Sequence, residues 1–448
     1  MKKPVSCILY LLVFAFLGSA GYAELHCVSP SGNDAGPGTE ARPWRTIQKA
    51  AEAAGAGDTI YVRAGTYRER VVFRVSGAEG RFITLMPRPG EEAILEGRGI
   101  RLPADWGGLL EISGRSHIRI GGLKIRNAGP HANNPGVLVD GSRWIIIENI
   151  HTYNTASSGI GVWNSEHVAL AGNEVELACN DGQQECITVA GTAHFEVRNN
   201  RVHRGGPGTR GGEGIDAKDG SREGKIFGNQ LYDLSRVGLY VDAWDKHTHD
   251  IEVFGNLVHD VRADGLALAS ESGGLLEGIR LYNNIAFRNK GSGLSISRNG
   301  ESSGHPMDRI LVVNNTMYGN GLGPWGGGIA VDNPDVRNLI IRNNILSLNR
   351  VFQIEVEPDV PKRSALIEYN LIHGFRDYLD ETRGAAFIKK DPLFMDAAGG
   401  DFRLSGSSPA VDSGSSLGAP SRDFAGNPRP QGSGYDLGAF ELMAGERR

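Results

Sequence analysis

Ile251-Glu252-Val253-Phe254-Gly255-Asn256 is one copy of a pattern that recurs along most of this 448-residue chain. Each copy has apolar residues at alternate positions, then a small or polar residue, and then an asparagine. The asparagines stand 24 to 31 residues apart, at positions 149, 173, 200, 229, 256, 284, 315, 344 and 370. A period in the twenties with several short strands per repeat is typical of a solenoid.

A second segment follows most of these asparagines after 9 to 14 residues, and it consists of a glycine followed by alternating residues, as in Gly238-Leu239-Tyr240-Val241-Asp242. The alternation predicts that Ile215, Leu239, Leu266 and Leu294 point into the core and that the residues between them point outward. Strands of this kind, one per turn, stack in parallel about 4.8 Å apart. The sequence therefore predicts an all-β chain folded as a parallel β-helix.

The repeated asparagines are interpreted as structural residues. Asparagine tolerates the left-handed turn between two strands, and stacked asparagine side chains satisfy each other's amide groups. We therefore expect them to form a ladder along one corner of the coil and do not count them as site residues.

Composition narrows the class of protein. Glycine accounts for 63 residues, hydrophobic residues for 40 % and charged residues for 22 %, which suits a turn-rich β protein and excludes wholesale disorder. The formal net charge is −5. A nucleic-acid partner is not expected, because the chain has no domain-scale basic field to neutralise phosphates.

The first residues have the features of a secretory signal peptide. Lys2 and Lys3 precede an apolar run from Cys7 to Leu17, which is too short to span a bilayer, and Gly21-Tyr22-Ala23 offers small residues at a cleavage site. No second long apolar run follows. We expect residues 1–23 to be removed near Ala23 and the mature chain to be secreted or periplasmic, without a transmembrane segment.

The rest of the chain divides into three parts. Residues 24–57 are predicted to cap the open end of the coil with a short helix inside the range 43–55, which Gly55 would stop. Residues 58–385 are predicted to form about ten turns of β-helix, from near Asp58 to near Asp380. The Gly-, Ser- and Pro-rich residues 386–448 are expected to pack along or cap the last turns.

Three cysteines remain once Cys7 leaves with the signal peptide. Cys179 and Cys186 are close enough in sequence to close a small loop in an oxidising compartment, and Cys27 is then unpaired. The alternative is that Cys179 and Cys186 are two free thiols.

Several motifs resemble those of secreted, bacterial right-handed β-helix proteins with the pectate-lyase fold. The opening motifs are Ser29-Pro30-Ser31-Gly32-Asn33-Asp34, Pro43-Trp44-Arg45-Thr46-Ile47-Gln48, Gly57-Asp58-Thr59-Ile60 and Gly65-Thr66-Tyr67, and the closing motifs are Asp423-Phe424-Ala425-Gly426-Asn427-Pro428-Arg429-Pro430 and Asp436-Leu437-Gly438-Ala439-Phe440-Glu441. The resemblance implies a right-handed coil and carbohydrate chemistry. It does not choose among lyases, hydrolases and non-catalytic members.

One charged block stands out among the outward positions. Asp216 and Lys218 lie one turn before Tyr240 and Asp242, and the long loop 203–213 enters the block from the neighbouring corner. Carboxylates, a lysine and aromatic rings suit a polysaccharide that also stacks on rings. The candidate catalytic residues are Asp216, Lys218, Asp242 and Asp245, and the candidate substrate-binding residues are Tyr240, Trp244, Trp163, Arg210, His247 and Glu271. The plain alternative is an exposed ion pair between Lys218 and Asp242.

A lyase mechanism is one interpretation. Glu213-Gly214-Ile215-Asp216-Ala217-Lys218 resembles a segment of calcium-dependent pectate and alginate lyases, which implies Lys218 as the base and Ca²⁺ at Glu213, Asp216 and Asp242. Two departures stand against it. Arg236-Val237-Gly238-Leu239-Tyr240 lies where such a pectate lyase would place calcium-binding aspartates, and an alginate lyase of that type would have an arginine near Asp242. Asp216 and Asp242 should also raise the pKa of Lys218, which is wrong for a base.

A hydrolase mechanism is the interpretation we favour. Asp216 and Asp242 should lie roughly 8 Å apart across adjacent turns, in the range of glycosidase carboxyl pairs. Residues 238–242 resemble the aspartate-bearing strand of β-helix glycosidases, and Asp216, Asp245 and Glu271 all remain possible partners of Asp242. This mechanism needs no cofactor. A third possibility is a non-catalytic glycan-binding or scaffold protein, and in each case we expect a monomer.

Overall fold

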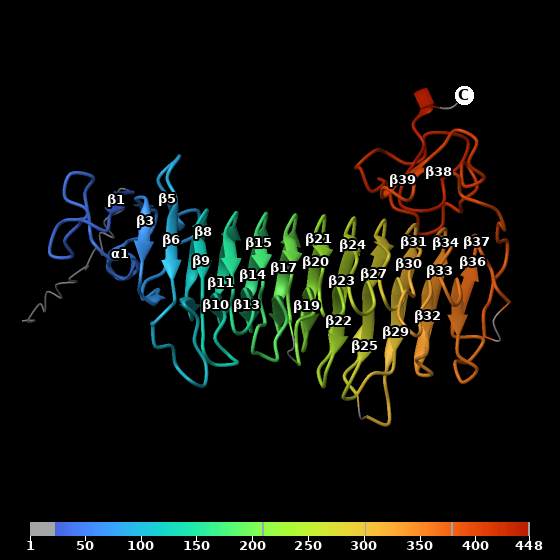
Figure 1. Cartoon of the computed structure of the whole chain (residues 1–448), viewed down its shortest axis with the longest axis horizontal. Coiled ribbons are helices and arrows are strands. Elements are labelled where there is room, and N and C mark those ends of the chain that lie inside the picture. The colour runs from blue at the N-terminus through green and yellow to red at the C-terminus, as the bar shows by residue number, and fades with distance from the viewer. Residues whose placement is uncertain (1–22, 208–209, 301, 378–379, 447–448) are drawn as a thin grey trace, which may run out of the picture.

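The computed structural model describes residues 23–207, 210–300, 302–377 and 380–446. Most of the predicted signal peptide, residues 1–22, lies outside these ranges. Successive strands visit three long sheets in turn, and all pairing within the three sheets is parallel. The coil extends along one axis, as Figure 1 shows, so the predicted all-β fold, a right-handed parallel β-helix, is confirmed.

The strands of each sheet are as follows. Sheet I contains β1 (Leu25–Val28), β2 (Thr59–Val62), β5 (Ile83–Pro87), β8 (Ser116–Gly121), β11 (Arg143–Glu148), β14 (Glu166–Ala171), β17 (Ala193–Arg198), β20 (Arg222–Phe227), β23 (Thr248–Phe254), β26 (Leu276–Glu277), β27 (Arg280–Tyr282), β30 (Met307–Val313), β33 (Val336–Arg342) and β36 (Ala365–Glu368). Sheet II contains β3 (Gly65–Tyr67), β6 (Ala93–Glu96), β9 (Lys124–Arg126), β12 (His151–Tyr153), β15 (Glu174–Glu176), β18 (Arg201–His203), β21 (Gln230–Tyr232), β24 (Leu257–His259), β28 (Ile285–Phe287), β31 (Thr316–Tyr318), β34 (Ile345–Ser347) and β37 (Leu371–His373). Sheet III contains β4 (Val71–Val72), β7 (Leu110–Ser113), β10 (Val137–Asp140), β13 (Ile160–Trp163), β16 (Ile187–Ala190), β19 (Ile215–Lys218), β22 (Leu239–Ala243), β25 (Leu266–Ser270), β29 (Leu294–Ser297), β32 (Ile329–Val331) and β35 (Ile354–Val356).

The coil is longer than the spacing of the asparagines predicts. Within the described ranges sheet II has 12 strands, one per turn, rather than about ten. Strand pairing also begins earlier than Asp58, because β1 pairs in parallel with β2. The inward positions are as expected, since Ile215, Leu239 and Leu266 are each at most 1 % exposed and belong to one continuous apolar core.

The N-terminal end of the coil is covered by α1 (Ile47–Ala53), as the sequence predicts. The hydroxyl of Thr46 accepts a hydrogen bond from the backbone N–H of Lys49, which caps the first turn. The helix ends at Ala54, which has extended backbone, and not at Gly55. No helix in the described part of the chain has the length and hydropathy needed to cross a membrane.

A buried asparagine ladder runs along the corner between sheets I and II. The side-chain amide of Asn256 donates to the carboxamide oxygen of Asn284 at 3.0 Å and to the backbone carbonyl of Ile226 at 2.9 Å. The same pattern repeats from Asn173 to Asn370. Because each amide is satisfied by its neighbours, the structural interpretation of these asparagines is confirmed. The left-handed turn, however, is made by the residue before each ladder asparagine, as by Gly255 (φ 61°) before Asn256.

The first asparagine of the series, Asn149, is not a member of the ladder. Asn149 has a φ of 51° and occupies the left-handed turn residue, while Ile150 takes the ladder position and its backbone N–H donates to Asn173. A second ladder, which the sequence pattern did not reveal, joins Asn289, Asn320 and Asn349 at the corner between sheets II and III. Two corners of the coil are therefore held by amide stacks.

The C-terminal tail folds back over the last turns (Figure 1). It contains the antiparallel pair β38 (Phe394–Asp396) and β39 (Asp401–Leu404) and a short 3-10 helix, η1 (Ala444–Glu446). Phe402 packs against Ile285 and Phe287 of β28, and Leu404 packs with Leu371 of β37. The tail thus covers part of sheet II, and it also contacts sheet I, where Arg342 of β33 donates to the backbone carbonyl of Leu417.

The described cysteines are free thiols. Cys179 and Cys186 are both buried, and the thiol of Cys179 donates to the backbone carbonyl of Gln184 at 2.8 Å. The structure therefore has the two unpaired thiols and not the Cys179–Cys186 disulfide. Burial, together with the neighbouring Cys186, raises the pKa of the Cys179 thiol, so this group stays protonated.

Candidate functional site

The candidate site lies on sheet III, where β16, β19, β22 and β25 stand side by side. Asp216 is paired in register with Tyr240, and Asp242 with Ala269. The alternation thus places the block as the sequence predicts, on the outer face of the strands. The outward direction does not bring exposure, however, because Asp216, Asp242 and Tyr240 are only 1 %, 4 % and 7 % exposed.

The predicted surface ion pair between Lys218 and Asp242 is replaced by a buried arrangement. The ammonium Nζ of Lys218 donates to Glu185 Oε1 at 2.6 Å and lies 3.8 Å from Asp216 Oδ2. The Lys218 side chain is 19 % exposed and that of Glu185 only 6 %. The Lys218 side chain therefore lies over the carboxylates of Glu185 and Asp216 and points toward the preceding turn.

Glu185 is the residue of this cluster that the sequence reasoning missed. It lies in the connection between β15 and β16, two residues before the strand, and Glu213 holds the same position before β19. The hydroxyl of Thr188 donates to Glu185 Oε2 at 2.8 Å, which fixes the carboxylate beneath Lys218. The sequence does carry a signal for Glu185, because it stands two residues before its strand, as the predicted Glu213 does before the next one.

Burial shifts the titration of the cluster. Burial raises the pKa of Asp216, and the charge of Asp242 raises it further. Burial also raises the pKa of Asp242, although the charge of Lys218 opposes the shift. For Glu213, burial and the nearby Glu185 raise the pKa to about 7. Several of these carboxyl groups can thus carry a proton near neutral pH.

Lys218 has the opposite character. Burial acts to lower the pKa of Lys218, but the charges of Glu185 and Asp216 outweigh that effect and hold the pKa above its ordinary value. The ammonium is therefore firmly protonated. In this arrangement Lys218 can neutralise and orient negative charge, but it is a poor proton acceptor.

Tyr240 and Glu271 form a hydrogen-bonded pair beside the cluster. The Tyr240 hydroxyl donates to Glu271 Oε1, and Glu271 is half-buried at the end of β25. Within the described chain, Asp216 Oδ1 and Asp242 Oδ1 are buried and have no hydrogen-bond partner. A buried carboxyl oxygen without a partner is costly unless the group is protonated or meets a ligand.

The remaining predicted residues lie around this cluster. Trp163 packs edge-on against Trp106, with ring centroids 4.4 Å apart. Trp244 and Asp245 follow the end of β22 and are exposed, so Asp245 is not part of the buried group. His247 pairs with Glu277 at 2.9 Å on sheet I. Arg210 is exposed in the loop before β19.

A calcium ion would need six to eight oxygen ligands. Glu213, the first predicted ligand, has the guanidinium of Arg236 at 3.8 Å. The other two, Asp216 and Asp242, offer one unpartnered oxygen each, and the ammonium of Lys218 lies beside Asp216. Two fixed cations thus stand among the carboxylates that the lyase resemblance assigns to calcium, and this donor set does not fit the ion.

One curated relative covers most of the chain. It is the uncharacterized protein YwoF of Bacillus subtilis strain 168, which is 28 % identical over an alignment that covers 87 % of this chain and 92 % of that protein. Two solved structures share the fold over 94 % of this chain. The complex of XylC with xylose has a TM-score of 0.61 at 13 % identity and is covered over 98 % of its length, and pectate lyase Pel9A has a TM-score of 0.56 at 14 % identity and is covered over 97 %.

A family model described as "Pel9A-like, right handed beta helix region" matches residues 26–329. This range runs from β1 to β32 and includes the whole cluster on sheet III. At identities of 13 % and 14 % the two structures establish the fold and leave the reaction open. The range matched by the family model is most of the chain, so the chain belongs to the Pel9A-like right-handed β-helix family.

Proposed function

We propose that this protein is an exported enzyme that hydrolyses glycosidic bonds of a polysaccharide, with Asp242 and Glu271 as its acid/base pair. The observation that carries the proposal is the state of Asp242. Its pKa is raised by burial, and its Oδ1 atom has no hydrogen-bond partner in the described chain. A carboxyl group that is kept protonated near neutral pH is the form that can donate a proton to a leaving sugar oxygen.

Glu271 is the best of the three partners considered for Asp242. Asp216 is 1 % exposed and lies beneath Lys218, while Asp245 is exposed outside the cluster. Glu271 is half-buried, and its carboxylate accepts the Tyr240 hydroxyl. This position beside Tyr240 suits the role of base or nucleophile.

Lys218 and the tryptophan pair would bind the substrate. The Lys218 ammonium is protonated and partly exposed, so it can donate to sugar hydroxyl or carboxylate oxygens. At the same time it stabilises the buried carboxylate of Glu185. Trp163 lies in the same outward column two turns earlier, in contact with Trp106. Its ring offers an apolar surface on which a pyranose can pack.

A calcium-dependent lyase is the second candidate, and family membership favours it. Lys218 lies in the segment that resembles the lyase motif, and the family model takes its name from a Pel9A protein. Against it stand the raised pKa of Lys218 and the two cations among the predicted calcium ligands. The hydrolase is therefore the proposal, and the lyase defines the other arm of its test.

The deciding experiment is a screen of the purified chain against uronate-containing and neutral polysaccharides. Hydrolysis releases reducing ends without unsaturated products and continues in a chelator, whereas lyase action produces ultraviolet-absorbing unsaturated ends and stops in a chelator. The expected result is reducing ends alone. Unsaturated products would refute the hydrolase proposal, and glycan binding without any cleavage would refute both enzymatic candidates.

A further inference from the structure

Sheet I carries a column of residues that stand outside the pairing register, one per strand. In β14 and β17 these are His167 and His194, with φ angles of 53° and 51°. Trp144 in β11 and Glu223 in β20 occupy the same place, with φ angles of 56° and 53°. Because each neighbouring strand has one left-handed residue at this point, the regular alternation is interrupted at the same place in every strand.

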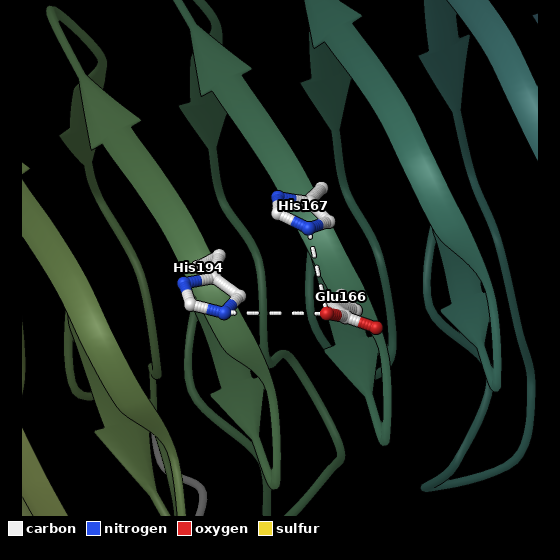
Figure 2. Close-up of side chains that lie close together, drawn as sticks. All are labelled: Glu166, His167 and His194. Carbon is white, nitrogen blue, oxygen red and sulfur yellow. Dashed lines mark ion pairs between the residues drawn. The ribbon is translucent and has the colours of Figure 1, made fainter. Parts of the chain in front are cut away.

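The rings of this column are stacked and share one orientation. The rings of Trp144 and His167 lie 3.9 Å apart at an angle of 7°, and those of His167 and His194 lie 4.8 Å apart at 12°. Trp144 therefore covers one face of the first imidazole. With the ring planes set in this way, both imidazoles present their Nε2 edges toward the same side (Figure 2).

A carboxylate stands where these edges point. Glu166 Oε1 lies 3.4 Å from His167 Nε2 and 4.0 Å from His194 Nε2, as Figure 2 shows. Glu223 reaches the same region from the next strand, with Oε2 at 3.1 Å from His194 Nε2. Ligand atoms that share a tetrahedral zinc ion with bonds near 2.0 Å are about 3.3 Å apart. One atom from each of Glu166, His167 and His194 lies within 4.8 Å of the other two, so the three side chains are near enough to share an ion. Because the two imidazole planes are nearly parallel, at least one ring must turn to direct its Nε2 atom at that ion.

We propose that Glu166, His167, His194 and Glu223 form a surface site for a divalent transition metal of the zinc type. Two imidazoles and two carboxylates suit a borderline ion and disfavour calcium, which prefers an all-oxygen shell. The two glutamates supply the charge that balances a dication. No Lys or Arg in the described chain forms an ion pair with Glu166 or Glu223, so a protein cation does not compete for them.

A second group on sheet II provides the contrast. His151 lies 3.2 Å from Glu176, and Glu174 completes a set of similar composition. There, however, both carboxylates already have arginine partners, since Arg201 pairs with Glu174 and Arg204 with Glu176. Guanidinium groups that hold these oxygens repel a metal ion. The group on sheet II therefore serves as an internal control, because it contains the same residue types, histidine and glutamate.

The ligands are accessible, because the side chains of His167, His194 and Glu166 are 32 %, 42 % and 53 % exposed. An ion can therefore enter from solvent without unfolding of the coil. Exposed ligands also hold a metal less tightly than a closed structural site, so we expect micromolar affinity. Sheet I is separate from the cluster on sheet III, and metal binding is independent of the proposed hydrolase activity.

The test is calorimetric titration of the chelator-stripped, dialysed full chain with zinc sulfate, followed by cobalt(II) absorption spectra. The expected result is one zinc per chain, with a cobalt spectrum typical of nitrogen and oxygen ligands. His167→Ala and His194→Ala should each weaken binding at least about tenfold, the scale of losing a ligand contact. His151→Ala, from the group on sheet II, should bind as the unmodified chain does. Circular dichroism checks that each variant is folded.

Three outcomes would overturn the proposal. The unmodified chain could bind no zinc, folded His167→Ala and His194→Ala could bind it with unchanged affinity, or His151→Ala could lose as much affinity as they do. Asp242→Asn should keep full zinc affinity. Because calorimetry needs no substrate, failure of the zinc site and failure of the hydrolase proposal remain distinguishable.

Discussion

Two acidic clusters lie along the same outer face of sheet III, several turns apart. The central cluster, Glu185, Glu213, Asp216, Lys218 and Asp242, has an ammonium in its middle. The distal cluster consists of Glu355 in β35, Glu357 just after it and Asp332 just after β32, and it has Arg298 only at its edge. Both contain carboxyl oxygens that are buried without a partner, at Asp216 and Asp242 in one and at Asp332 and Glu355 in the other.

The difference between the two clusters shows how a cation placed among buried carboxyl groups changes their environment. In the distal cluster, burial and the neighbouring carboxylate of Glu357 raise the pKa of Glu355 to about 7, and Arg298 is engaged with Asp359 outside it. In the central cluster, Lys218 opposes the same effects and also offers a partly exposed donor beside aromatic rings. Buried carboxyl groups alone are therefore a feature of this sheet face, and the lysine with Tyr240 and Glu271 distinguishes the candidate site.

The largest effect should separate the two clusters by activity. Asp242→Asn is expected to lower turnover at least about a hundredfold, the scale of losing a positioned acid or base. Asp332→Asn makes the same change, from a carboxyl group to an amide, in the distal cluster and should leave turnover within about twofold. Both should keep nearly unchanged melting temperatures, because an amide resembles the protonated carboxyl that each site favours. Initial rates on the polysaccharide found by the product screen provide the measurement.

An equal loss of turnover in Asp332→Asn would contradict this comparison and would move the chemistry toward the distal cluster. Glu271→Gln sharpens the same test. As the proposed catalytic partner of Asp242, Glu271 should be as sensitive as Asp242, whereas Asp245→Asn should have little effect, since Asp245 is exposed outside the cluster.

The fold was predictable from the sequence because each turn repeats a local pattern. The asparagine period predicted the corner ladder. The alternation around Leu239 and Leu266 predicted the inward positions. Burial of Asp216 was not predictable in this way. Glu185 lies in a connection between sheets II and III, and these connections vary in length, so the strand alternation does not reveal that Glu185 bonds to Lys218. Period-two alternation predicts whether a side chain points into the core or outward. Whether an outward side chain is buried depends on the loops that cover it.

The next effect concerns stability. Lys218→Ala removes the partner of the buried Glu185 carboxylate and should lower the free energy of unfolding by about 3 kcal/mol, as for other broken buried ion pairs. Arg298→Ala at the distal cluster breaks an ion pair with Asp359 whose side chains are 45 % and 48 % exposed, and it should cost less than about 1 kcal/mol. Denaturant unfolding monitored by circular dichroism measures both.

Kinetics of Lys218→Ala also separate the two enzymatic candidates. In a hydrolase the variant should mainly raise KM, since Lys218 binds substrate, while a lyase base would lose turnover as severely as Asp242→Asn. Measurements belong well below the melting temperature, so that loss of folded protein does not imitate loss of catalysis. A stability cost no larger than that of Arg298→Ala would mean that the Lys218–Glu185 pair contributes little.

The smallest effect is the pH dependence of the distal cluster. The folded-state pKa of Glu355 is about 7, above the ordinary value of 4.5, so the folded chain holds this proton more tightly than the unfolded chain. The resulting stabilisation is complete below about pH 4.5 and is lost as the pH rises through about 7. Glu355→Gln removes that loss, so its melting temperature should exceed that of the unmodified chain by about 2–4 °C above pH 7 and match it near pH 4.5. Glu79→Gln, at an exposed position, is the control and should show no such divergence. A constant difference at every pH would show that folding does not raise the pKa of Glu355, and a variant that is less stable above pH 7 would show that the fold stabilises the charged carboxylate.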